Sequence, residues 1–179
     1  MKKTTNTLLW VIDMMSTVIF CALCLQTGFL LINLVYLLVD PQGGKDLLFE
    51  MDSLTQLYTL NKFHFSILIF LALTISVMKA LSFYFTMKIF STLNLVKPFS
   101  TEIASLISKI SYLILTLGSL GTVALRYSES LEFIGVNLNE LQPFWDDNAA
   151  YLLMGSIVFV IAQVFKKGLE LQSESDLTI

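Results

Sequence analysis

The residues from Met14 to Val39 form one apolar run without a charged side chain. About 20 helical residues cross the hydrocarbon core of a bilayer, which is about 30 Å thick, and this run is longer than that. Three further, largely apolar stretches follow it. The sequence therefore predicts an all-α integral membrane protein with four transmembrane helices, at about 14–39, 63–88, 103–125 and 149–167.

The composition supports the same class. Only 14% of the residues are charged, against about 25% in an ordinary soluble domain. The net charge of −3, with no basic patch carrying interleaved aromatic residues, argues against direct binding of nucleic acid. Because the first apolar run is too long for the core of a secretion signal, we expect it to be a retained helix.

The distribution of basic residues predicts the orientation. Four spans put both termini on one side, and cytoplasmic segments of membrane proteins carry the excess of lysine and arginine. With cytosolic termini, the inside holds Lys2, Lys3, Lys79, Lys88, Lys97, Lys109, Lys166 and Lys167, and the outside holds Lys45, Lys62 and Arg126. The external loops would then be residues 40–63, with an amphipathic helix over 45–60, and residues 126–148.

The segment 97–100, Lys-Pro-Phe-Ser, is expected to join the second and third helices on the cytosolic side. Pro98 disfavours helix in the residue before it, so the incoming helix should end near Val96. Ser100 suits the N-cap of the next helix, and Glu102 then lies in its first turn, where the helix dipole favours an anion. The ordinary interpretation is a capped helix–turn–helix joint, and the alternative is a docking point for a soluble partner.

Small residues mark one face of the third helix. They recur at spacings of three, four or seven, which allows close approach of two membrane helices, and they are Ala104, Ser108, Ser111, Gly118 and Thr122. Gln26 and Asn33 are seven residues apart on the first helix. They should share a face that points at protein rather than lipid.

The candidate residues for chemistry have ordinary explanations. Cys21 and Cys24 lie inside an apolar span, where packing is favoured over redox or metal binding. His64 is the only histidine; a pH-sensing or proton-pathway role is the alternative to a plain interfacial position. Asp13 is expected to pair with a lysine such as Lys109. Trp145 is expected to anchor the outer interface.

Asp146 and Asp147, together with the other acids of the second external loop, give only a weak signal for a metal. The sequence contains no phosphate-binding loop, zinc spacing or nucleophile–base pair. We therefore expect no catalytic residue, no metal and no cofactor.

Gly168 is expected to end the fourth helix, which leaves residues 168–179 as an acidic cytosolic tail. The tail carries apolar side chains at Leu169, Leu171, Leu177 and Ile179. An extended segment of this kind can add to a sheet edge or fill a groove of a partner. The alternative is that it folds back onto the cytosolic hairpin of its own chain.

Two motifs, the stretch Lys97-Pro98-Phe99-Ser100-Thr101-Glu102 and the ending from Phe165 to Ile179, resemble a known family. It is the bacterial membrane family catalogued as domain of unknown function 2975, with four spans, a central Asn-Pro-Phe-Ser signature and a similar C-terminus. Lys97 and Ser175 stand where this family often has asparagine. The resemblance implies a multi-pass protein of the bacterial inner membrane without an established activity. It also implies, by analogy, a helix-turn-helix regulator as a cytosolic partner.

Two hypotheses of function follow. The first is a non-catalytic regulatory or scaffolding partner, for which the candidate binding residues are Pro98, Phe99, Ser100, Gly168, Leu171, Asp176, Leu177 and Ile179. The second is a small transporter or channel with a path lined by Gln26, Asn33 and Gln163. Because four spans are few for a monomeric carrier, it would assemble as a homo-oligomer along the Gly118 stripe. Gly118, Thr122, Gln26 and Asn33 are the candidate helix-packing residues.

Overall fold

The computed structural model describes residues 2–39, 52–93, 100–132, 135 and 138–176, and the regular structure of these residues is helical. Its elements are α1 (Lys2–Val39), α2 (Asp52–Leu60), α3 (Lys62–Thr92), α4 (Thr101–Glu132), the 3-10 helix η2 (Asn139–Phe144) and α5 (Asn148–Asp176). Within the described residues, four helices are long and apolar enough to cross a membrane, which indicates a membrane protein. The expected all-α fold with four such helices is confirmed.

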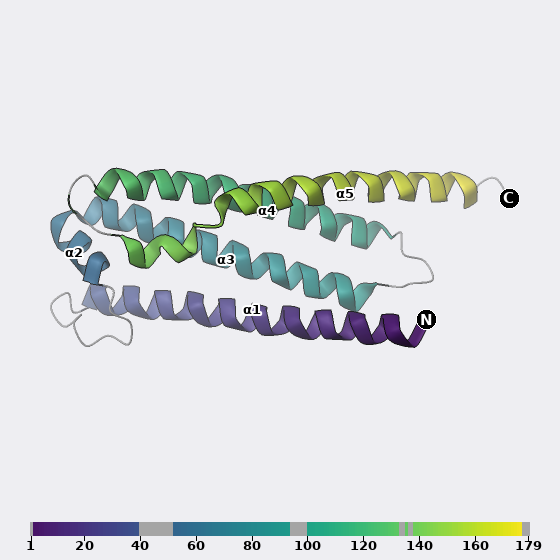
Figure 1. Ribbon diagram of the computed structural model, residues 1–179, viewed down its shortest axis with the longest axis horizontal. Helices are drawn as coiled ribbons and strands as arrows, with labels where there is room; N and C mark the ends of the chain where they lie inside the picture. Colours follow the sequence, from purple (N-terminus) through teal and green to yellow (C-terminus); the bar gives the residue numbers. More distant parts are fainter. Residues whose placement is uncertain (1, 40–51, 94–99, 133–134, 136–137, 177–179) are drawn as a thin grey trace.

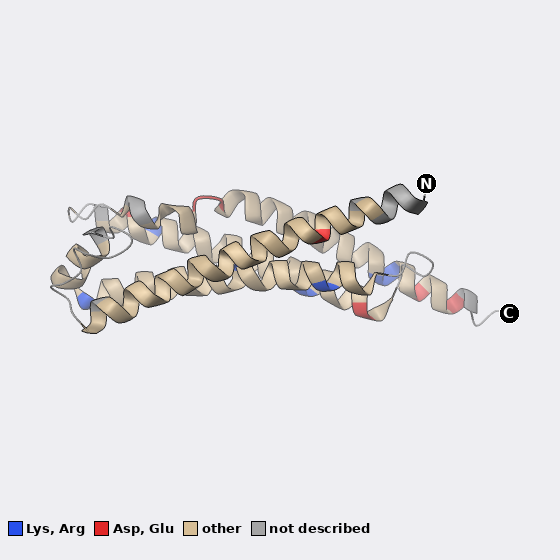
Figure 2. Ribbon diagram, turned by 90° about the horizontal axis from the view of Figure 1, so that it is seen from below, with Lys and Arg blue, Asp and Glu red and all other residues tan. Residues whose placement is uncertain are grey.

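The four long helices lie side by side along one direction (Figure 1). α3 packs between α1 and α4, and the most extensive helix pair is α4 with α5. Both chain ends lie at the same end of the bundle as the α3–α4 connection, and α2 lies at the opposite end (Figure 1). Charged residues are concentrated toward the two ends of the long helices (Figure 2). Which end faces the cytosol stays a prediction.

Side chains cap the starts of α3 and α4. Asn61 precedes α3 in an extended conformation, and its side-chain oxygen accepts from Phe63 N at 2.9 Å. At the start of α4, Ser100 Oγ accepts from Ile103 N at 3.2 Å, as expected of an N-cap. Such a cap is worth about 1 kcal/mol.

The expected end of the second helix near Val96 is wrong. α3 ends at Thr92, and Leu93 has an extended ψ of 115°. Ser91 Oγ bonds back to Lys88 O at 3.0 Å, and hydroxyl residues of this kind compete with the helical backbone. The helix stops well before the proline; Pro98 and Phe99 lie outside the described residues. The Ser91 bond does not explain this end, because Ser82 and Thr86 make similar bonds inside the same helix.

Buried side chains of α3 and α4 form the centre of the core. Leu68, Ala72 and Ile75 of α3 are fully buried, and Leu117 and Ala124 of α4 belong to the same cluster. At the end of the bundle opposite to the two termini, α2 adds its buried leucines 54 and 57. The amphipathic helix expected over 45–60 is thus found from Asp52 and packs on the bundle; residues 45–51 lie outside the described range.

Glycines set the distance between α4 and α5. A Cβ on Gly118 would lie 2.8 Å from the backbone nitrogen of Leu152, and a Cβ on Gly155 would lie 2.9 Å from that of Leu115. Real side chains do not fit at such distances. The two backbones touch because each helix presents a glycine to the other, which is how small residues bring membrane helices together.

The second external loop is shorter than expected, because α4 continues to Glu132. The segment 138–145 is also not a surface loop. Leu138, Leu141 and Trp145 are at most 1% exposed, so the interpretation of Trp145 as an interfacial anchor is wrong. These apolar side chains gain more by packing against α3 and α4 than at the interface.

Gly168 does not end the fourth helix, because α5 continues to Asp176. A glycine inside a helix costs about 1 kcal/mol relative to alanine. Good helix formers surround it, and Lys167 Nζ pairs with Glu170 at 2.8 Å one turn along. The local gain outweighs the glycine, so the residues expected to form an extended tail are helical up to Asp176.

Candidate functional site

α5 (Asn148–Asp176) begins partway along its neighbour α4. A Cβ on Gly121 would lie 3.0 Å from Asn148 Cβ, the first residue of α5, and 3.7 Å from Trp145 Cβ. At 1.5 Å per residue, Gly121 is about 30 Å from the start of α4 and about 16 Å from its end. The acidic link between η2 and α5 accordingly lies partway along the bundle (Figure 2). Residues 138–145 pack in the part of the bundle that a full-length fourth helix would fill.

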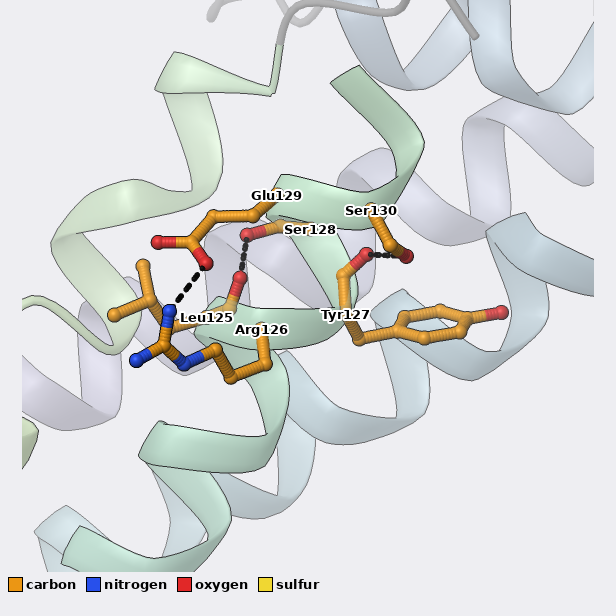
Figure 3. Close-up of polar contacts among 6 residues, drawn as sticks. All are labelled: Leu125, Arg126, Tyr127, Ser128, Glu129 and Ser130. Atoms are coloured by element: carbon orange, nitrogen blue, oxygen red, sulfur yellow. Dashed lines mark hydrogen bonds and ion pairs between the residues drawn. The ribbon is translucent and has the colours of Figure 1, made fainter. Parts of the chain in front are cut away.

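Along α4, polar residues lie on both sides of the position where α5 begins. Tyr127 OH lies 2.6 Å from His64 Nδ1, and in Figure 3 the Tyr127 ring points away from the Arg126–Glu129 ion pair. Lys109, near the other end, is about 27 Å from Tyr127 along the axis. That separation approaches the thickness of a hydrocarbon core, about 30 Å. Asn148, where α5 begins, packs against Gly121 between these two levels.

A lysine of α3 faces this break. Lys79 Nζ lies 3.5 Å from the carbonyl oxygen of Pro143 and 5.5 Å from the ring centroid of Tyr151. The carboxylates of Asp146 and Asp147 act on its charge electrostatically, Asp147 more strongly. We call these five residues the Lys79 cluster. It draws on α3, η2, the link and α5, and it closes the gap in the fourth span.

The electrostatics of the Lys79 cluster follow from the helix ends that meet there. The last carbonyls of η2 carry partial negative charge toward the ammonium, and the first N–H groups of α5 carry partial positive charge toward the carboxylates. The cluster holds two carboxylates and one ammonium, so it is negative overall when all three groups are ionised; both aspartates are exposed. Charges within a membrane are costly and pair with one another, and such groups mark functional sites by default.

Trp145 adds an unpaired group beside this break. Its indole Nε1 is buried and has no hydrogen-bond partner among the described residues. A buried donor left unpaired costs about 1–3 kcal/mol. This part of the fold is therefore not optimised for stability alone.

Sequence reasoning missed the Lys79 cluster. Lys79 was assigned to the cytosol and the two aspartates to the outside, which placed them on opposite faces of the membrane. The available signal was the isolation of Lys79 among apolar residues, together with Pro143 at the start of the fourth apolar stretch. A lysine at that place also fits a side chain that extends to the interface, so the pattern alone did not decide.

The candidate partner-binding residues lie at the end of the bundle that holds both termini. Ser100 caps α4 there, and Gly168 and Leu171 lie on the last turns of α5, of which Asp176 is the final residue. The remaining candidates lie outside the described residues: Pro98, Phe99, Leu177 and Ile179. The structure therefore brings the two candidate regions to one end but does not describe a joint surface.

The candidate packing residues are placed as follows. Gly118 touches the α5 backbone, and Thr122 Oγ1 donates to the carbonyl oxygen of Gly118 at 2.9 Å. On α1, Asn33 is buried and Gln26 is half-buried, whereas Gln163 of α5 is exposed. Gly118 is thus occupied by packing within the chain, so it does not offer a surface to a second copy.

The isolated polar residues have simple surroundings. Within the described residues, Asp13 does not pair with Lys109, whose ammonium lies instead 5.8 Å from the Phe85 ring centroid. Cys21 and Cys24 are free thiols on the exposed side of α1. In the described part of the chain, histidine, cysteine, aspartate and glutamate form no group of three that could hold a metal ion.

Comparison with known proteins gives one relationship. No curated protein and no solved structure matches the chain. The family profile described as "Protein of unknown function (DUF2975)" matches residues 5–179, from the start of α1 to the last residue. With four membrane-length helices and a match over essentially its whole length, the chain belongs to the DUF2975 family.

Proposed function

We propose that the protein is a non-catalytic membrane protein that holds a soluble regulatory partner at the cytosolic end of α5. The observation that carries this proposal is the continuation of α5 to Asp176, past the paired basic residues Lys166 and Lys167. The last turns of α5 extend beyond the ends of the other helices (Figure 1). The positive-inside distribution supports a cytosolic position for this end.

The exposed end of α5 suits recognition as a helix in a groove. Leu171 is 56% exposed, on a stretch where Lys167 and Glu170 already pair with each other. A preformed helix loses less conformational entropy on binding than an extended tail. A partner with an apolar groove and a basic rim would take Leu171 and complement the acidic residues 170 and 174. We therefore propose that a helix binds in a groove of the partner, and not that an extended tail adds to a sheet edge.

The test is affinity purification from native membranes in mild detergent, with mass spectrometry of the co-purified proteins. We expect one soluble protein to be retained by the full chain and to be depleted at least tenfold by Leu171→Ser and by truncation after Lys167. Leu153→Ala is the matched control, because Leu153 is 67% exposed on the same helix at membrane depth. Equal retention by all four chains, or no retention by the full chain, contradicts the proposal.

The Lys79 cluster favours a second candidate, a small transporter or channel. Interrupted membrane helices with half-helix ends near the middle of the bilayer are typical of ion and substrate sites in transporters. Vesicles reconstituted with the protein should then pass protons or alkali-metal cations down an imposed gradient, and Lys79→Met should change the rate at least tenfold. The absence of flux under proton, sodium and potassium gradients removes this candidate.

A further inference from the structure

A shallow groove separates α3 and α4 on the lipid-facing surface. It has a volume of about 320 Å³ and is lined by Leu81 and Phe85 of α3 and by Lys109, Tyr112, Leu113 and Thr116 of α4. Its walls are almost entirely apolar, and Lys109 is its one charged lining residue. Lys109 and Thr116 are about 10 Å apart along the helix axis. The groove thus has a cationic end, and its other end lies deeper in the bundle.

Among the described residues, Lys109 lacks the acidic partner that Lys88 and Arg126 have. Lys88 lies 3.8 Å from Glu102, and Arg126 lies 3.1 Å from Glu129. Lys109 is exposed and has no carboxylate at ion-pair distance among the described residues; its ammonium lies over the face of Phe85. A basic side chain near the end of a membrane helix attracts anionic headgroups.

We propose that this groove binds one anionic phospholipid, with its phosphate on Lys109 and an acyl chain along Leu81, Leu113 and Thr116. The charge at the interfacial end and the apolar walls below it match the two parts of such a molecule. Basic pockets between membrane helices on the cytoplasmic side bind anionic headgroups in this way. The phosphate compensates the charge of Lys109, and its binding is independent of any partner at the end of α5.

A second groove serves as an internal comparison. It lies between α1 and α3, has a volume of about 510 Å³ and is lined by residues such as Phe20, Cys24, Leu31, Leu81 and Tyr84. It is larger than the α3–α4 groove but has no charged side chain in its lining. Acyl chains of any lipid can fill it, so it should not discriminate between headgroups. Of these two grooves, only the one with Lys109 should prefer an anionic lipid.

The test is native mass spectrometry of the full chain released from nanodiscs with equal amounts of phosphatidylglycerol and phosphatidylcholine. We expect one retained phosphatidylglycerol with about tenfold preference, which corresponds to about 1.4 kcal/mol. Lys109→Gln should reduce the preference to twofold or less, and Thr116→Trp, which fills the groove, should reduce retention of that lipid. Arg126→Gln is the matched control on the same helix and should change neither result.

Two results would overturn the proposal. One is equal retention of both lipids by the unaltered protein. The other is a preference that survives Lys109→Gln. Soluble glycerol phosphate separates the headgroup from the chain: at millimolar concentration it should not displace the lipid, because it lacks the apolar part. Displacement by it would show a bare phosphate site and exclude the acyl-chain groove. Each readout compares lipid masses on intact protein, so loss of a partner at α5 does not affect it.

Discussion

Gly118→Ala is expected to lower the free energy of unfolding by about 3 kcal/mol, whereas the same substitution at Gly28 raises it by about 0.5 kcal/mol. The new methyl carbon at Gly118 would lie 2.7 Å from Leu152 Cγ and 2.8 Å from Leu152 N. The side chain of Leu152 can rotate away, but its backbone nitrogen moves only if α5 moves. Overpacking costs about 1–3 kcal/mol when side chains adapt, and contact with the backbone puts this site at the upper end.

The matched site, Gly28, is also a helical glycine, on α1, and a Cβ there meets no atom within 4 Å. Alanine at this position only restricts the unfolded chain and improves helix propensity. Reversible unfolding in detergent micelles, followed by circular dichroism, gives both free energies. Equal effects of the two substitutions would show that α4 and α5 are not in backbone contact.

Gly155 makes the same argument from the other helix. A Cβ there would lie 2.9 Å from Leu115 N and 2.9 Å from Leu115 Cγ. If both glycines serve the same crossing, the double substitution should cost less than the sum of the two single ones, because one displacement of α5 relieves both clashes. Additive costs would instead indicate two separate local adjustments.

The sequence predicted the four membrane helices because hydrophobic length is a property of each segment alone. An apolar run as long as that from Met14 to Val39 predicts a membrane helix, whatever the rest of the chain does. The cap at Ser100 was also predictable, since it depends on a hydroxyl three residues before the N–H that it accepts from. These features do not need knowledge of the neighbouring helices.

The burial of the segment 138–145, just before the fourth helix, was not predictable in the same way. Leu138, Leu141 and Phe144 alternate with polar and acidic residues, which locally reads as a surface loop. Their burial depends on α3 and α4, whose positions are set by contacts distant in sequence. The predicted helix end at Gly168 is wrong for a related reason: a single glycine costs less than the helix formers on both sides of it contribute.

Lys79→Met is expected to destabilise the protein by about 2 kcal/mol, the second largest effect. The substitution keeps an unbranched apolar chain but leaves Asp146 and Asp147 without the ammonium that acts on them. Removing one partner of a buried charge pair costs about 3–5 kcal/mol, and this figure is lower here because Lys79 is half-buried and both aspartates are exposed. The same unfolding experiment in micelles gives the value.

Lys62→Met is the control for the loss of a cation at an aromatic ring. Lys62 Nζ lies 5.2 Å from the ring centroid of Tyr58, similar to the contact of Lys79 with Tyr151, but at the exposed start of α3. We expect it to cost less than about 0.5 kcal/mol, as exposed contacts do. A loss equal to that of Lys79→Met would mean that the aromatic contact, and not the two carboxylates, explains the effect.

Removing the carboxylates separates charge balance from packing. If Lys79 stabilises the fold by balancing Asp146 and Asp147, then Asp146→Asn and Asp147→Asn together should restore most of the stability lost in Lys79→Met. The same pair of asparagines in the unaltered background should destabilise, because the ammonium then lacks its anions. Since Asn148, directly after this link, starts α5 against Gly121 inside the bundle, such a sign reversal would show that the interrupted fourth span is held at that depth by charge. A rescue that fails would assign the role of Lys79 to its carbonyl and ring contacts.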